Sequence, residues 1–287
     1  MRKVPVLEVV KFAYLFLFHE FGTIFRLVWF PLAIVALLGF AQGYLGIEAK
    51  VAAADFTYEP PSAAIFNLLV QIVSIVAFAM TAVALHRVIL FNDRLPGTWL
   101  LFSLKRPERL FIGLSFLVGL VAIVAVAIPA VLAATTGASA AGILIGVILL
   151  GIGAYLVVRL WPIYPIIVVE GRFSFREAFA LSKGNFWRLV AVGTLGMLPV
   201  MIVGGGATLL FTRFYLAGVD EWAAASDDPF RSAGDALQTY LAVVSISGFL
   251  FSVVATGIGV PLICYSYKAL RNIGAFEYLD ENAAGRT

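Results

Sequence analysis

The segment 110–158 contains 49 consecutive residues without a charged side chain. A run of this length accommodates two membrane-spanning helices of about 20 residues each and the turn between them. Within lipid, every backbone N–H and C=O group has to be satisfied by the chain itself, so an isolated apolar segment crosses a membrane as a helix. This segment therefore predicts an all-α integral membrane protein.

The composition supports this class and argues against several others. Hydrophobic residues make up 62% of the chain and charged residues only 13%, whereas soluble domains contain roughly 25% charged residues. The single cysteine, Cys264, excludes an intramolecular disulfide. The two histidines do not form a cluster with metal-ligand spacing, and catalytic motifs such as HExxH and GxSxG are absent from the sequence. We therefore expect a non-enzymatic protein without a metal, a cofactor or a nucleic-acid partner.

Six membrane spans are predicted when about 20 apolar residues are assigned to each crossing. They cover residues 27–46, 63–90, 110–134, 140–167, 189–212 and 236–267.

The distribution of basic residues predicts the orientation of these spans. One side would carry both termini, the loops 91–109 and 168–188, and 17 of the 20 Lys and Arg residues. The other side would carry only Lys50, Arg213 and Arg231, together with eight acidic residues. Because basic residues are enriched in cytoplasmic loops, both termini are predicted to be cytoplasmic.

A threefold pattern runs through the chain. Each odd-numbered span is preceded by an Arg-Leu pair (Arg26, Arg109 and Arg188 supply the arginines) and by a short amphipathic stretch, at 6–18, 99–104 and 175–181. Such stretches suit helices lying in the membrane interface. One interpretation is a single membrane domain, 1–287, made of three repeats at 1–96, 97–171 and 172–287. The alternative is that arginine occurs at any cytoplasmic boundary without a repeat.

The region 165–189 carries the most specific motifs of the chain, with PIIVVEG at 165–171, SFREA at 174–178 and LSKGNFWRL at 181–189. These motifs resemble those of a broad, largely uncharacterised bacterial family of six-span membrane proteins. That family is similar to the membrane domain of some glycerophosphodiester phosphodiesterases, but their catalytic domain is not recognisable here. The resemblance implies a six-span fold in the bacterial inner membrane and carries over no catalytic residue.

Within these motifs, two local features are expected. Ser174 followed by Glu177 has the spacing of a capping box at a helix N-terminus. Gly184 suits a helix end, since glycine readily adopts a positive φ angle.

Arg87, Arg159 and Lys268 are the candidate site residues, because each lies near the cytoplasmic end of an even-numbered predicted span. If the repeats are real, the three cations occupy equivalent positions and would suit a phosphate or another anionic headgroup. The alternative is that each side chain reaches the interface independently. For Arg159 the choice between burial and snorkelling depends on whether its helix ends at Pro162.

Two functions fit these expectations. The first is a protein that binds or moves membrane lipids, anionic ones in particular, or another amphipathic or anionic small molecule. The second is a structural or assembly subunit of a larger membrane complex, with membrane-protein partners or a second copy of the chain.

Overall fold

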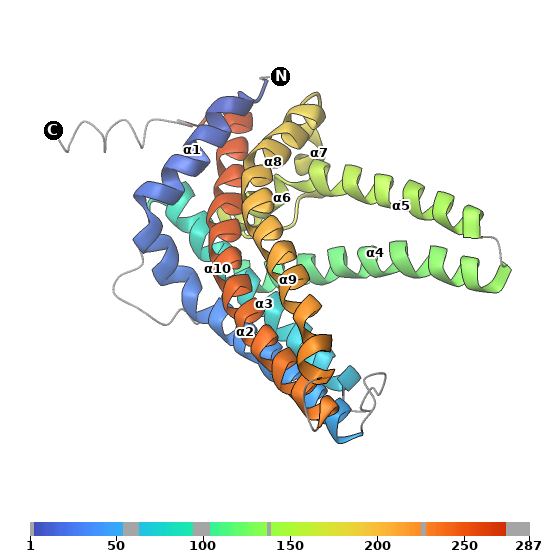
Figure 1. Cartoon of the computed structure of the whole chain (residues 1–287). Coiled ribbons are helices and arrows are strands. Elements are labelled where there is room, and N and C mark those ends of the chain that lie inside the picture. Colours follow the sequence, from blue (N-terminus) through green and yellow to red (C-terminus); the bar gives the residue numbers. More distant parts are fainter. Residues whose placement is uncertain (1–2, 54–62, 94–103, 137–138, 225–227, 274–287) are drawn as a thin grey trace.

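The computed structural model describes residues 3–53, 63–93, 104–136, 139–224 and 228–273, and within these ranges it contains helices and no strand (Figure 1). The α-helices are α1 (Val6–His19), α2 (Phe21–Ala52), α3 (Ala63–Phe91), α4 (Arg106–Thr136), α5 (Ser139–Leu160), α6 (Ile163–Glu170), α7 (Phe175–Ser182), α8 (Phe186–Val200), α9 (Gly206–Ala224) and α10 (Pro229–Arg271), with a π-helical turn, η1 (Met201–Gly205), between α8 and α9.

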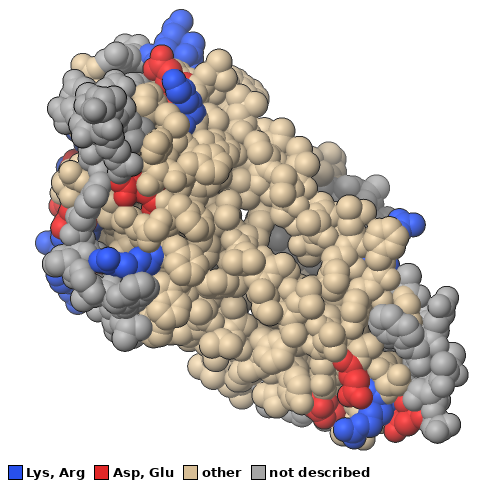
Figure 2. Space-filling view, turned by 60° about the vertical axis from the view of Figure 1, so that its left-hand side comes forward, with Lys and Arg blue, Asp and Glu red and all other residues tan. Residues whose placement is uncertain are grey.

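Among the described residues, five segments are long and apolar enough to cross a membrane. They are Phe21–Ala52, Ala63–Phe91, Leu144–Glu170, Phe186–Tyr215 and Arg231–Arg271. The remaining predicted span, 110–134, falls in α4, where many side chains from residue 121 onward lie outside the described part. Figure 2 shows charged side chains at two ends of the molecule and a broad belt of other residues between them, as expected for a membrane protein.

The helices form a bundle with a separate hairpin. α10 packs along α2 and α9, and α2 packs on α3. The start of α1 and the end of α10 lie at the same end of this bundle, which we call the terminal end (Figure 1). α4 and α5 pack on each other and project away from the bundle.

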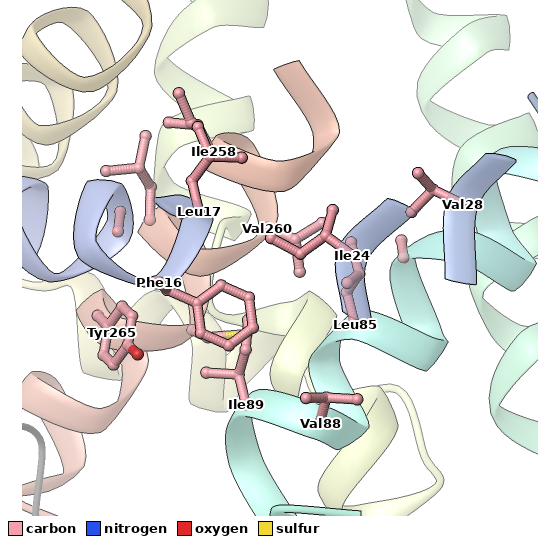
Figure 3. Packing of buried hydrophobic residues seen from close by; sticks show 14 of the residues in the cluster. Phe16, Leu17, Ile24, Val28, Leu85, Val88, Ile89, Ile258, Val260 and Tyr265 are labelled. Atoms are coloured by element: carbon pink, nitrogen blue, oxygen red, sulfur yellow. The ribbon is translucent and has the colours of Figure 1, made fainter. Parts of the chain in front are cut away.

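The buried core lies where α1, α2, α3 and α10 meet near the terminal end (Figure 3). Phe16, Ile24, Leu85 and Ile258 are all at most 1% exposed. The absence of a side chain at Gly257 gives room for Leu17 between α1 and α10, because a Cβ atom there would lie 2.8 Å from Cδ1 of Leu17. Close contacts of this kind suit helix association in lipid, where packing replaces the hydrophobic driving force.

Two predicted spans depart from a single regular helix. The span predicted at 140–167 is interrupted, since α5 ends at Leu160 and α6 begins at Ile163. Pro162 lies in this break and has no backbone N–H to continue the helical hydrogen bonds. The span predicted at 189–212 is continuous but contains the π-helical turn, which follows Pro199.

The short predicted helices and their ends are found in part. Helices α1 and α7 occur at the predicted stretches 6–18 and 175–181, whereas 99–103 lies outside the described residues. The predicted capping box is wrong, because the Ser174 side chain makes no capping hydrogen bond and Glu177 instead binds arginines. The positive φ of Gly184 is confirmed at 75°. The threefold repeat stays a prediction.

Candidate functional site

Arg87 is paired with a neighbouring carboxylate. It lies near the C-terminal end of α3, and its Nη2 and Nε atoms donate to Oδ2 of Asp93 at 2.6 and 3.1 Å. Both side chains are about one third exposed, at 32% and 36%. The charge of Arg87 is therefore balanced within its own helix end.

Lys268 lies against an aromatic ring near the end of α10. The residue is only 9% exposed, and its Nζ atom lies 5.8 Å from the ring centroid of Tyr265. A cation over the face of an aromatic ring is attracted by the electron density of that face.

Arg159 sits in the last turn of α5 between two aromatic rings. Its Cζ atom lies 5.2 Å from the ring centroid of Phe179 on α7 and 6.0 Å from that of Tyr155. The Nε atom is buried and has no hydrogen-bond partner among the described residues. The Ser182 hydroxyl lies within hydrogen-bonding distance of two carbonyl oxygens, that of Arg159 at 2.9 Å and that of Ala178 at 2.8 Å.

The three predicted site residues thus lie in three different environments. Arg87 has a carboxylate partner, while Arg159 and Lys268 lie against aromatic rings belonging to different helices. That the three cations bind one anion together stays a prediction. The helix break at Pro162 places Arg159 at the end of α5, at the side of α7.

A charged cluster that the sequence reasoning missed joins α6, α7 and α10. The Nη2 atom of Arg271 donates to Glu170 at 3.0 Å and also to Glu177. Arg172 binds the same two carboxylates, at 2.6 and 3.3 Å. The motif at 165–178 supplies both acids, but their partner Arg271 is about 100 residues away in the chain, and no local spacing indicates that pairing.

Two residues of the motif at 181–189 bind the N-terminal segment. Asn185 Oδ1 accepts a hydrogen bond from the Val4 N–H at 3.0 Å, and Arg188 Nη1 donates to the Val4 carbonyl at 2.9 Å. Further along α1, the Tyr14 hydroxyl donates to the Gly196 carbonyl at 2.8 Å, and burial raises the pKa of this hydroxyl. The junction of α7 and α8 is therefore an anchoring point for α1.

An apolar groove of about 340 Å³ runs between the α4–α5 hairpin and the helices α6 and α7. Residues of all four helices line it, among them Leu117, Gly153, Leu160, Ile163 and Phe175. Its volume lies at the lower end of the roughly 300–1,000 Å³ typical of small-molecule pockets. We call it the α4–α7 groove.

A second apolar cavity, of about 660 Å³, lies between α1, the α8–α9 segment and α10. Its polar wall residues include Thr208 and Ser247, whose hydroxyls donate to backbone carbonyls of their own helices at 2.9 and 2.6 Å. These hydroxyl protons are therefore engaged and do not mark a polar ligand.

In the described part of the chain, no three His, Cys, Asp or Glu side chains lie where they could together hold a metal ion. His86 is buried, with Nδ1 at 2.7 Å from the Ala82 carbonyl oxygen, and its ring lies edge-on to Phe111. This position indicates a packing role.

Comparisons with models of protein families, with curated proteins and with solved structures returned no match.

Proposed function

We propose that this chain is a non-enzymatic protein of the bacterial inner membrane that binds or moves anionic amphipathic molecules, lipids in particular. Arg87, Arg159 and Lys268 supply the positive charge at the ends of their helices, and the apolar grooves accept the hydrocarbon part. Arg–phosphate hydrogen bonds are among the stronger polar contacts in proteins, and basic pockets between membrane helices suit lipid headgroups.

The observation that carries this proposal is the environment of Arg159. Its guanidinium forms no ion pair with any described carboxylate, and its buried Nε atom has no partner there. An arginine without a counter-ion at the end of a membrane helix is available to pair with an anionic group. An anionic ligand would supply the counter-charge that the described residues do not.

Native mass spectrometry of protein released from its own membrane tests the proposal. We expect the wild type to retain anionic phospholipid, and a variant combining Arg87→Gln, Arg159→Gln and Lys268→Gln to lose most of it. Arg213→Gln, which removes an exposed cation from α9, is the control and should retain the lipid. Equal retention by the wild type and the triple variant would contradict the proposal.

The proposal places both termini in the cytoplasm, and thiol labelling tests this orientation. Cys264 is fully buried, so its own labelling should be low in the folded protein. We expect an impermeant maleimide added to intact cells to label Arg213→Cys and to leave Lys183→Cys unlabelled until the cells are opened. The reverse pattern would contradict the orientation.

A role as an assembly subunit is the alternative, and the projecting α4–α5 hairpin favours it (Figure 1). Large apolar side chains on this hairpin are more than half exposed, including Leu120, Ile123, Leu144 and Val147. Exposed apolar surface of this kind suits either lipid or another membrane helix. A stoichiometric partner protein that stays bound during purification, with no retained lipid, would support this alternative over lipid binding.

A further inference from the structure

We propose that the α4–α7 groove holds one acyl chain of an anionic phospholipid whose phosphodiester group binds Arg159. This inference rests on the proposed function and deepens it, because it assigns the ligand to one cation, one groove and one chemical class. Lys268 then contributes to the positive charge of the terminal end, while the charge of Arg87 is balanced by Asp93, and neither side chain contacts this phosphate.

The Arg159 guanidinium is prepared for an oxygen ligand. A guanidinium carries five N–H donors in a planar fork, and the buried Nε donor of Arg159 is unsatisfied among the described residues. The rings of Tyr155 and Phe179 lie 6.0 and 5.2 Å from its Cζ atom, and such neighbours restrict the side chain before a ligand binds. A phosphodiester offers two oxygens that match the fork and carries one negative charge.

The groove ends at residues that neighbour this guanidinium and its ring contact in the chain. Phe175 lines the groove, and Phe179, one turn further along α7, contacts Arg159. Residues four apart lie on the same face of a helix, so the groove and the guanidinium adjoin the same face of α7. On α5, Leu160 lines the groove directly next to Arg159. One molecule with a charged head and an apolar chain can therefore occupy both places.

The dimensions of the groove match one leaflet. Its wall on α5 extends from Leu149 to Leu160, which at 1.5 Å per residue corresponds to about 17 Å. Half of a typical hydrocarbon core is about 15 Å. The groove is thus about as long as the acyl chains of one leaflet are deep. Its lining is dominated by Leu, Ile, Val and Phe side chains, which solvate hydrocarbon and offer little to a polar ligand.

Two pairs of variants separate the headgroup contact from the acyl contact. Arg159→Gln removes the guanidinium, and Arg213→Gln is its matched control because Arg213 is an exposed arginine of α9, a helix that does not line the groove. Gly153→Leu fills the groove, since Gly153 lines it and an added Cβ meets no atom within 4 Å. Gly151→Leu is the matched control, because Gly151 has the same free space outside this lining.

The experiment measures binding of fluorescent phosphatidylglycerol to each purified full-length variant in phosphatidylcholine nanodiscs. We expect Arg159→Gln and Gly153→Leu each to weaken binding about tenfold, which corresponds to roughly 1.4 kcal/mol. The two controls should stay within about twofold of the wild type. Soluble glycerol phosphate should not compete, because it lacks the acyl chain.

The outcomes distinguish this inference from the proposed function. Specific binding by the wild type that is insensitive to both Arg159→Gln and Gly153→Leu would overturn this site and leave lipid binding intact. Equal effects of Gly153→Leu and Gly151→Leu would overturn the role of the groove. Competition by glycerol phosphate would show that the ligand is a water-soluble phosphate. Absence of phosphatidylglycerol binding by the wild type would overturn both proposals.

Discussion

Replacing Phe111 with alanine is expected to lower the free energy of unfolding by about 3 kcal/mol, the lower part of the range for deleting a buried aromatic side chain. Phe111 is 1% exposed, and its ring lies 4.9 Å from that of Tyr164 and 6.1 Å from that of Phe78, measured between centroids. These contacts join α4 to α6 and α3, so the cavity would also loosen the base of the α4–α5 hairpin.

Denaturant unfolding in detergent micelles measures the loss, and hydrogen exchange of α4 and α5 measures the loosening. Phe116→Ala is the control on the same helix, because Phe116 is 46% exposed and detergent can fill the space that its ring leaves. We expect this control to change the free energy of unfolding by less than about 1 kcal/mol. Equal losses for the two variants would show that Phe111 does not connect the hairpin to the bundle.

Replacing Arg271 with methionine is expected to lower the free energy of unfolding by about 2 kcal/mol. The substitution keeps most of the apolar side chain but leaves Glu170 and Glu177 with Arg172 as their remaining partner in the cluster. Breaking a fully buried ion pair costs roughly 3–5 kcal/mol. The expected loss is smaller because the side chains of Arg271 and Glu177 remain 31% and 23% exposed, so solvent screens their interaction.

A double-mutant cycle with Glu177→Gln measures the coupling directly. Once Glu177 is neutral, Arg271→Met should cost clearly less than it does in the wild type. Arg176→Met is the control, because Arg176 is exposed and forms no ion pair among the described residues. Additive effects of Arg271→Met and Glu177→Gln would show that the two residues do not stabilise one another.

Helical structure was predictable because its signals are local. The apolar runs correspond to helices such as α2 and α3. The amphipathic stretches correspond to α1 and α7, and the glycine at 184 has the positive φ angle expected of it. The local prediction failed at Ser174, where a capping box has the right spacing. Glu177 is instead drawn into ion pairs with Arg172 and Arg271, so a tertiary contact prevailed over the local motif.

The candidate site was only partly predictable. The sequence grouped Arg87, Arg159 and Lys268 into one candidate anion site, since each lies near the end of an apolar run. The structure separates them through neighbours that no spacing reveals, namely Asp93 for Arg87, Phe179 for Arg159 and Tyr265 for Lys268. Phe179 reaches Arg159 only because the chain turns at Pro162 and again before α7.

By itself, the sequence determined that this chain is helical and has apolar segments long enough to cross a membrane, because backbone groups in lipid have to be satisfied within each helix. It also determined where basic residues concentrate along the chain. Only the tertiary structure decided that Arg271 joins α10 to Glu170 and Glu177, and that an apolar groove lies beside Arg159. Such pairings depend on how helices distant in the chain pack, and helix packing in lipid is set by side-chain shape at each contact rather than by hydropathy.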